Sequence, residues 1–193
     1  MIKKIALYFK TIKESPILRR YFVMNGFDGI LTTLGILLAA ILSRSENIPN
    51  IIFTVFSAGV AMGISGFWGA VLVELAERKR ELKELERALF TNLSNTKLEE
   101  RLKYASITAG IVDGFSPLLF SIICVIPLFS FFLFQTKPIF LLIVSYIFGT
   151  ILLFILGAYL GRISRENWLL FGIKMASASL IVFVLVRLGK FIA

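Results

Sequence analysis

The two aspartates of this chain both stand inside long apolar runs. Asp28 lies in NGFDGILTTLGI and Asp113 lies in GIVDGFSPLLF, and each is followed by glycine. An ionised carboxylate is costly within a bilayer, so aspartates in spanning segments usually face a protein interior or a water-filled path. The two positions therefore predict carboxylates that bind cations or protons inside a membrane, and the alternative is a polar residue that bonds to a neighbouring helix without handling an ion.

Polar neighbours share a helix face with each aspartate. Asn25, Asp28 and Thr32 are spaced i, i+3, i+7, which places them on one face of a first helix. Helical spacing in the third apolar segment likewise groups four residues on one face: Ser106, Ala109, Asp113 and Ser116. We expect both faces to point toward the interior of a helix bundle. FDGILT and VDGFSP also resemble copies of one element, as in transporters built from internal repeats.

The second apolar segment carries one sulfur atom on a face of small residues. That face consists of Ala58, Met62, Ser65 and Gly69, at i, i+4, i+7 and i+11. Small residues let helices pack closely in lipid. A thioether is a soft ligand that suits a late divalent metal better than magnesium or calcium. Met62 is therefore a candidate metal ligand beside Asp28, and ordinary packing is the alternative, because methionine fills gaps.

A stripe of glutamates follows directly after this segment. Its members, at i, i+3, i+7 and i+10, are Glu74, Glu77, Glu81 and Glu84. One interpretation is a solvated helix laced with ion pairs such as Glu74 with Arg78. The other is a carboxylate cluster that collects divalent cations before they enter the membrane. A leucine stripe beside it indicates packing against a partner helix, and its members are Leu75, Leu82, Leu85 and Leu89.

Composition places these residues in an integral membrane protein. Hydrophobic residues make up 58% of the 193 residues, and the mean hydropathy is +0.87. A spanning helix needs about 20 mostly apolar residues. We therefore expect a single all-α membrane domain with five transmembrane helices, over residues 22–43, 51–75, 107–134, 138–160 and 167–189. Pro117 and Pro127 predict a kinked or tilted third helix.

The polar stretches predict the orientation. Residues 76–106 form a helical extension between the second and third spans, and Thr96 with Glu99 resembles a capping box that begins its second helix. The flank KKIALYFKTIKESPILRR is a basic amphipathic segment expected on the membrane surface. Sixteen basic residues fall on the side of these two stretches and four on the other. The positive-inside rule then puts the N-terminus and residues 76–106 in the cytoplasm, and five spans leave the C-terminus outside. The membrane is expected to be the plasma membrane of a prokaryote.

Several functions are disfavoured by residues that the sequence lacks. It has no histidine, and its one cysteine, Cys124, makes neither an intrachain disulfide nor a cysteine cluster. No phosphate loop or nucleophile–base pair is present, and neither aspartate has the G-x-G-D pattern of intramembrane aspartyl proteases. We therefore expect neither an enzyme nor a permanent cofactor, and the charge of +9 indicates membrane topology rather than nucleic-acid binding. Lys174, inside the fifth span, either reaches the cytoplasmic surface or pairs with Asp113.

Three stretches resemble the vacuolar iron transporter (CCC1/VIT) family. NGFDGILTTLGILLAA is similar to the first helix of that family, and AGVAMGISGFWGAVLVELAERKRELKEL is similar to its second helix with the glutamate-bearing extension. GAYLGRISRENWLLFGIKMASASLIVFVLVRLGKFI is similar to its closing two helices. The order of these elements carries the resemblance, which covers most of residues 22–192.

The resemblance implies a homodimer whose first two helices line a path for ferrous iron, with protons moving the other way. Asp28 and Met62 correspond to path residues, and the glutamate stripe corresponds to cytoplasmic metal-binding glutamates. Two features depart from the family: Gly66 stands where many members have a glutamate, and the cytoplasmic segment is short. Asp113 is a candidate replacement for that carboxylate. The sequence thus predicts an exporter of iron or manganese by proton antiport, and the alternative is a non-transporting scaffold or a lipid- or partner-binding homologue.

Overall fold

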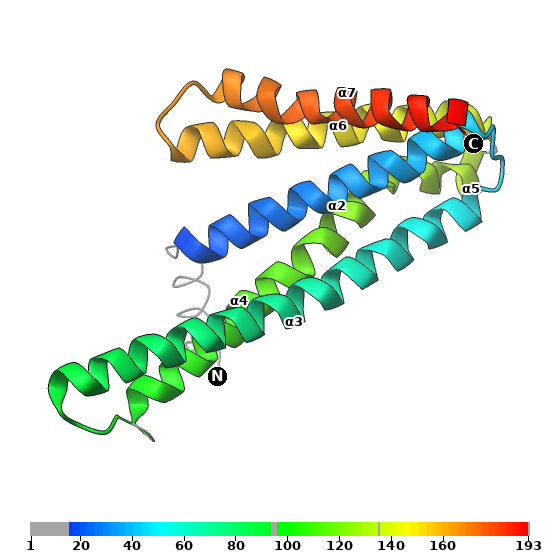
Figure 1. The fold of residues 1–193 in the computed structure, drawn as a ribbon. Coiled ribbons are helices and arrows are strands. Elements are labelled where there is room, and N and C mark those ends of the chain that lie inside the picture. The colour runs from blue at the N-terminus through cyan, green and yellow to red at the C-terminus, as the bar shows by residue number, and fades with distance from the viewer. Residues whose placement is uncertain (1–15, 94–95, 135, 193) are drawn as a thin grey trace. The chain divides into compact units, whose positions relative to one another are not determined.

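The fold is all-α, as the sequence predicts. A computed structural model describes residues 16–93, 96–134 and 136–192, and every regular element among them is a helix (Figure 1). Five helices in these ranges are long and apolar enough to cross a bilayer. The elements are α2 (Pro16–Leu42), α3 (Ile48–Leu89), α4 (Lys97–Cys124), η1 (Ile126–Ser130), α5 (Phe131–Phe134), α6 (Pro138–Ile163) and α7 (Trp168–Ile192). The chain is an integral membrane protein with five spanning helices.

Helix α3 joins the second span to the charged segment without a break. Its 42 residues extend over about 63 Å at the usual rise per residue. A bilayer core is only about 30 Å thick, so the C-terminal half of this helix extends beyond the membrane. The predicted helical extension is therefore a direct continuation of the second span.

Left-handed residues close three of the helices. Arg44, Phe90 and Arg165 have positive φ angles of 52°, 51° and 58°. At each end the following amide donates to a carbonyl five residues back, for example Ser45 to Ala40 at 3.0 Å and Glu166 to Gly161 at 3.0 Å. These are Schellman ends in which a larger residue takes the position that glycine favours.

The third apolar segment differs from the sequence prediction. Helix α4 begins at Lys97, where the hydroxyl of Thr96 accepts the amide of Glu99 at 3.4 Å, so the predicted second helix and the third span are one helix. It ends at Cys124, ten residues before the predicted boundary, and the short helices η1 and α5 follow. Pro117 stays within α4, whereas Pro127 lies in the first turn of η1. Proline disfavours the α conformation of the preceding residue, which explains why the α-helix does not continue to residue 134.

The described chain divides into two compact units. The first contains residues 16–25 and 62–116, and the second contains residues 26–61 and 117–192. The basic segment over residues 1–15, including Lys3, Lys4, Lys10 and Lys13, lies outside the described residues.

The second unit has an apolar core at one end and an antiparallel helix pair. Its buried cluster contains Leu37, Ala40, Ile48, Ile51, Val55, Val125, Leu128, Leu141 and Leu142. Helices α6 and α7 lie side by side along their lengths (Figure 1). Gly157 and Gly161 face α7, and the hydroxyl of Tyr146 donates to the carbonyl of Ser179 at 2.8 Å. Small residues thus permit the close approach that helix packing in lipid requires.

Candidate functional site

The first unit brings the start of α2 against the middle of α4 through two polar contacts. The carboxamide nitrogen of Asn25 donates to the carboxylate of Asp113 and also to the carbonyl of Tyr21, the latter at 3.2 Å. The hydroxyl of Ser116 donates to the carbonyl of Phe22 at 2.5 Å. Residues 22 and 25 are three apart, as are residues 113 and 116, so one helix face meets another.

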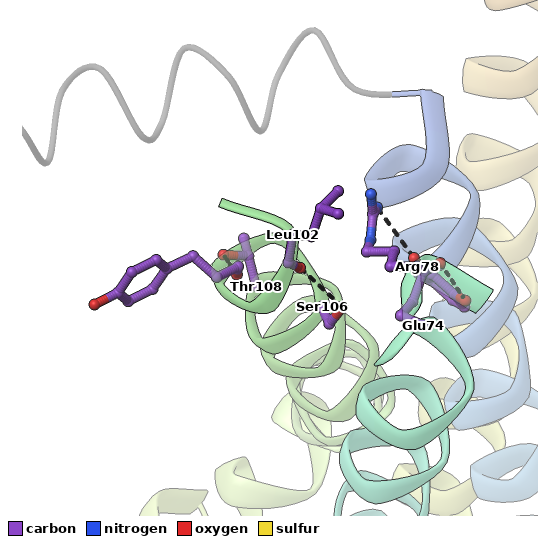
Figure 2. Close-up of polar contacts among 7 residues, drawn as sticks. Glu74, Arg78, Leu102, Ser106 and Thr108 are labelled. Carbon is purple, nitrogen blue, oxygen red and sulfur yellow. Dashed lines mark hydrogen bonds and ion pairs between the residues drawn. The ribbon is translucent and has the colours of Figure 1, made fainter. Parts of the chain in front are cut away.

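Asp113 is buried at this crossing. Its exposed fraction is 5%, and Ser106, Ala109 and Ser116 on the same face are also buried. The sequence prediction for this face is therefore confirmed: it points into the protein. The hydroxyl of Ser106 donates to its own helix, at the carbonyl of Leu102, 3.0 Å away, as Figure 2 shows.

Glycines bring α3 close to this carboxylate. A Cβ atom placed on Gly66 would lie 2.9 Å from Oδ2 of Asp113 and 3.3 Å from its carbonyl oxygen. Gly63 and Gly114 also meet backbone to backbone, because a Cβ on Gly114 would lie 2.5 Å from the carbonyl oxygen of Gly63. The carboxylate of Asp113 therefore fills the space into which a side chain at position 66 would project.

The packing face of α3 is not the predicted one. Ser65 and Gly69 are exposed, and a Cβ on Gly69 would meet no described atom within 4 Å beyond its own surroundings. Gly63 and Gly66 make the close approach instead. Their spacing of three residues is a signal in the sequence, but both the Gly63–Gly66 face and the Ser65–Gly69 face are rich in small residues, so composition does not choose between them.

Asp28 has surroundings unlike those of Asp113. It is exposed, although the sequence argument placed it toward the bundle interior. In the same helix, Asn25 and Thr32 are partly buried. The three residues share a helix face only approximately, because Asp28 faces outward in the single chain while Asn25 and Thr32 are partly covered. Asp28 belongs to the second unit, and the partly buried Met62 belongs to the first.

The glutamate stripe separates into paired and exposed members. Glu74 accepts the hydroxyl of Tyr21 at 3.1 Å and pairs with Arg78 at 3.1 Å, as Figure 2 shows for the arginine. Glu84 pairs with Arg80 at 3.1 Å, and this hydrogen bond raises the pKa of the arginine. Glu77 and Glu81 are exposed. The predicted Glu74–Arg78 ion pair is confirmed.

Part of the leucine stripe beside the glutamates packs against another helix, as predicted. Leu82 is buried and Leu75 is partly buried, and both lie beside Leu102 of α4. Leu85 and Leu89 are exposed. The partner helix for this part of α3 is therefore the first part of α4.

No group of three or more histidine, cysteine, aspartate or glutamate residues lies together within the described ranges. The carboxylates that the sequence singles out are thus spread along three helices of one chain. Lys174 is predicted either to reach the cytoplasmic surface or to pair with Asp113, and its Nζ lies 5.6 Å from the ring centre of Phe171 on its own helix.

Sequence reasoning missed the role of Tyr21. Its hydroxyl reaches Glu74 and its carbonyl accepts Asn25, so one residue links the glutamate stripe to the Asp113 crossing. The signal available in the sequence is its position one turn before Asn25, on the same helix face.

Comparison with known proteins gives one informative relative. The chain is 34% identical over 169 residues to the uncharacterized protein MJ0645 of Methanocaldococcus jannaschii. The matched region covers 86% of this chain and 85% of the relative. The two are members of one family. The match spans most of both chains. No family model matches the chain, and no solved structure matches it.

Proposed function

We propose that this protein exports ferrous iron or manganese from the cytoplasm in exchange for protons, as a homodimer related to the vacuolar iron transporter (CCC1/VIT) family. The observation that carries the proposal is an exposed aspartate midway along a spanning helix. Asp28 lies 12 residues after Pro16 and 14 before Leu42, about 18 Å and 21 Å along the axis.

A carboxylate at that depth is expensive if lipid covers it. Insertion scales give about 2.5–3.5 kcal/mol for a charged residue at a helix centre, and other approaches give more. The face that carries Asp28 is therefore better covered by protein or by water. A second copy of the chain provides both, because two copies of α2 around a symmetry axis place two Asp28 carboxylates along one path.

The remaining ligands are those that the sequence suggests, Met62 through the family resemblance and the polar residues through their helical spacing. Met62 supplies a soft sulfur from each copy, and Asn25, Thr32 and Ser65 supply polar groups along the path. Carboxylate oxygen with thioether sulfur suits iron or manganese better than magnesium. The metal ion is cargo in this scheme, and no permanently bound cofactor is required.

The exposed glutamates support an entry role on the cytoplasmic side. Glu77 and Glu81 face solvent on the part of α3 that extends beyond the membrane, and clustered carboxylates raise the local cation concentration. In the proposed topology, the N-terminus lies in the cytoplasm of a prokaryotic cell and the C-terminus lies outside its plasma membrane. A cysteine at Thr91 should then be labelled only from the cytoplasmic side, and one at Asn50 only from outside.

A groove in the second unit favours a second candidate function, the binding of a lipid. It encloses about 390 Å³ and is lined by apolar side chains that include Phe53, Phe56, Val125, Phe129 and Phe132. This volume falls within the usual range of small-molecule sites. Such a groove fits an alkyl chain, which would make the protein a lipid-binding homologue without transport.

Metal flux into proteoliposomes tests the first proposal against the second. Wild-type protein should carry Fe²⁺ and Mn²⁺, and Asp28→Asn should reduce the flux about tenfold or more, since tenfold corresponds to only about 1.4 kcal/mol. Glu46→Gln, which changes an exposed carboxylate outside the spans, is the matched control. Wild-type flux in the Asp28→Asn variant would contradict the proposed path, and absence of flux in all three proteins would favour lipid binding.

A further inference from the structure

We propose that a basic row on the part of α3 beyond the membrane binds the phosphate-bearing headgroups of anionic lipids. The row consists of Lys79, Lys83 and Arg87, which are spaced i, i+4 and i+8 and are all exposed. It belongs to the first unit, whereas Asp28 and the apolar groove belong to the second. The inference goes beyond the proposed function, because it holds whether or not the protein carries a metal.

Helix stability does not explain why three basic side chains stand in one row. Like charges at i and i+4 destabilise a helix, whereas glutamate and lysine at this spacing stabilise it. Lys83 has Lys79 four residues before it and Arg87 four residues after it. Among the described residues, none of the three forms an ion pair. The row is therefore a concentration of positive charge whose repulsion an anion would relieve.

Three carboxylates on the same part of α3 do not compensate this charge. A step of two residues turns a helix by about 200°. Glu77 and Glu81 each lie two residues from Lys79, so they project from the opposite side of the helix. Glu86 accepts the backbone amide of Leu93 at 2.8 Å and is thus engaged by the loop that follows α3. The acidic and basic faces of this helix are therefore separate surfaces.

The basic row lines a shallow hollow on the surface of α3. The hollow encloses about 420 Å³, which falls within the usual range of small-molecule sites. Its lining consists of Ala76, Lys79, Arg80, Lys83, Glu84 and Arg87. Four of these side chains are positive, and the one negative side chain, Glu84, pairs with Arg80 at 3.1 Å. The hollow therefore combines room for an anion with an excess of positive charge.

The place of the basic row along α3 favours a lipid headgroup over a soluble anion. The apolar segment ends at Val73, so Lys79 and Lys83 lie about 9 Å and 15 Å beyond it along the helix axis. The headgroup layer is about 5–8 Å thick. Side chains on a helix lean toward its N-terminus, and α3 leaves the membrane at its C-terminal end. Both lysines therefore lean back toward the headgroups, as in other basic clusters that recognise anionic lipids beside a spanning helix.

Thermal unfolding of the detergent-solubilised chain, with short-chain lipids added at constant ionic strength, tests this inference. Dioctanoyl phosphatidylglycerol should raise the unfolding temperature, Tm, in a saturable manner, because ligand binding stabilises the folded state. Dioctanoyl phosphatidylcholine has the same acyl chains without net charge and is the control. An equal response to the two lipids, or an equal response to inorganic phosphate and phosphatidylglycerol, would overturn the site.

Single substitutions connect the response to the basic row. Lys79→Gln should raise the half-saturating phosphatidylglycerol concentration about fivefold, as expected for one basic residue at an anionic membrane surface. Lys97→Gln removes the same charge from an exposed position of α4. Because α4 enters the membrane at its C-terminal end, its side chains lean away from the headgroups, and this variant should respond like wild type. Equal weakening by the two variants would assign the response to overall charge and overturn the site.

The third member of the basic row separates a lipid from a soluble partner. Arg87 lies about 21 Å beyond the apolar segment, farther than the headgroups extend, so Arg87→Gln should weaken the response less than Lys79→Gln. A soluble anion, such as a single-stranded oligonucleotide, would reach all three members equally. A larger loss in Arg87→Gln, or oligonucleotide binding without a lipid response, would overturn the assignment to lipid. None of these measurements uses metal flux, so a failure of the transport proposal is distinguishable from a failure of this one.

Discussion

Asp28 and Asp113 share a local sequence and differ in almost everything around it. Each is followed by glycine and stands near the middle of a spanning helix, yet Asp113 is 5% exposed and Asp28 is exposed. Asp113 contacts Asn25 of another helix within its own unit. The comparison indicates that one aspartate joins helices inside the chain, while the other is presented to something outside it. Local sequence alone does not decide between these roles.

The largest difference should appear when each aspartate is replaced by leucine. Asp113→Leu removes the acceptor of the Asn25 hydrogen bond and leaves a carboxamide N–H without its partner. The free energy of unfolding in detergent should therefore fall by about 1–3 kcal/mol. Asp28→Leu exchanges an exposed carboxylate for an apolar side chain, so stability should stay the same or rise while metal flux is lost. Chemical denaturation and proteoliposome flux measure the two effects. Equal destabilisation by both variants would remove the distinction.

A glycine pair sharpens the comparison on α3. A side chain at Gly66 would meet the Asp113 carboxylate at 2.9 Å, whereas Gly69 is open in the single chain. Overpacking of a filled site costs about 1–3 kcal/mol, so Gly66→Val should lower stability by that amount. Gly69→Val should change the monomer little, and melting curves of the two proteins would show whether the carboxylate occupies this space.

The sequence predicted much of this arrangement because the helix period is reliable over long apolar segments. It correctly placed Ser106, Ala109, Asp113 and Ser116 on one buried face, since four residues at helical spacing define a direction. It also located all five spanning helices, with boundaries that shift by several residues. The end of α4 was the exception, because Pro117 and Pro127 look alike in sequence but only the second ends an α-helix.

The sequence could not predict which face of a helix packs against another, because this depends on which helix lies opposite. The predicted face of Ser65 and Gly69 and the observed face of Gly63 and Gly66 are equally small. Asp28 likewise shares its helical spacing with Asn25 but not its burial. Contacts between helices determine which of two similar faces is buried, and the spacing of residues within one helix does not indicate those contacts. The similarity of FDGILT and VDGFSP stays a hypothesis of repetition.

A smaller effect is expected for the serine beside Asp113. Ser116→Ala removes the hydrogen bond to the Phe22 carbonyl, so stability should fall by about 1 kcal/mol. Ser65→Ala is the matched change on an exposed position of α3 and should be close to neutral. The two denaturation midpoints would show whether the Asp113 crossing is held by more than one contact. Similar midpoints would assign the crossing to Asn25 and Asp113 alone.

The smallest effects should come from the glutamate stripe. Replacing the exposed Glu77 and Glu81 with glutamine should change stability by less than about 0.5 kcal/mol, as for most surface substitutions. If these two carboxylates collect metal, the double variant should still raise the half-saturating Mn²⁺ concentration for transport and leave the maximal flux intact. Glu74→Gln is the informative partner, because it disrupts the contacts with Tyr21 and Arg78 and should lower stability by up to about 1 kcal/mol. Unchanged Mn²⁺ dependence in the double variant would mean that the stripe is a solvated, ion-paired helix, leaving Asp28 as the first carboxylate that the metal meets.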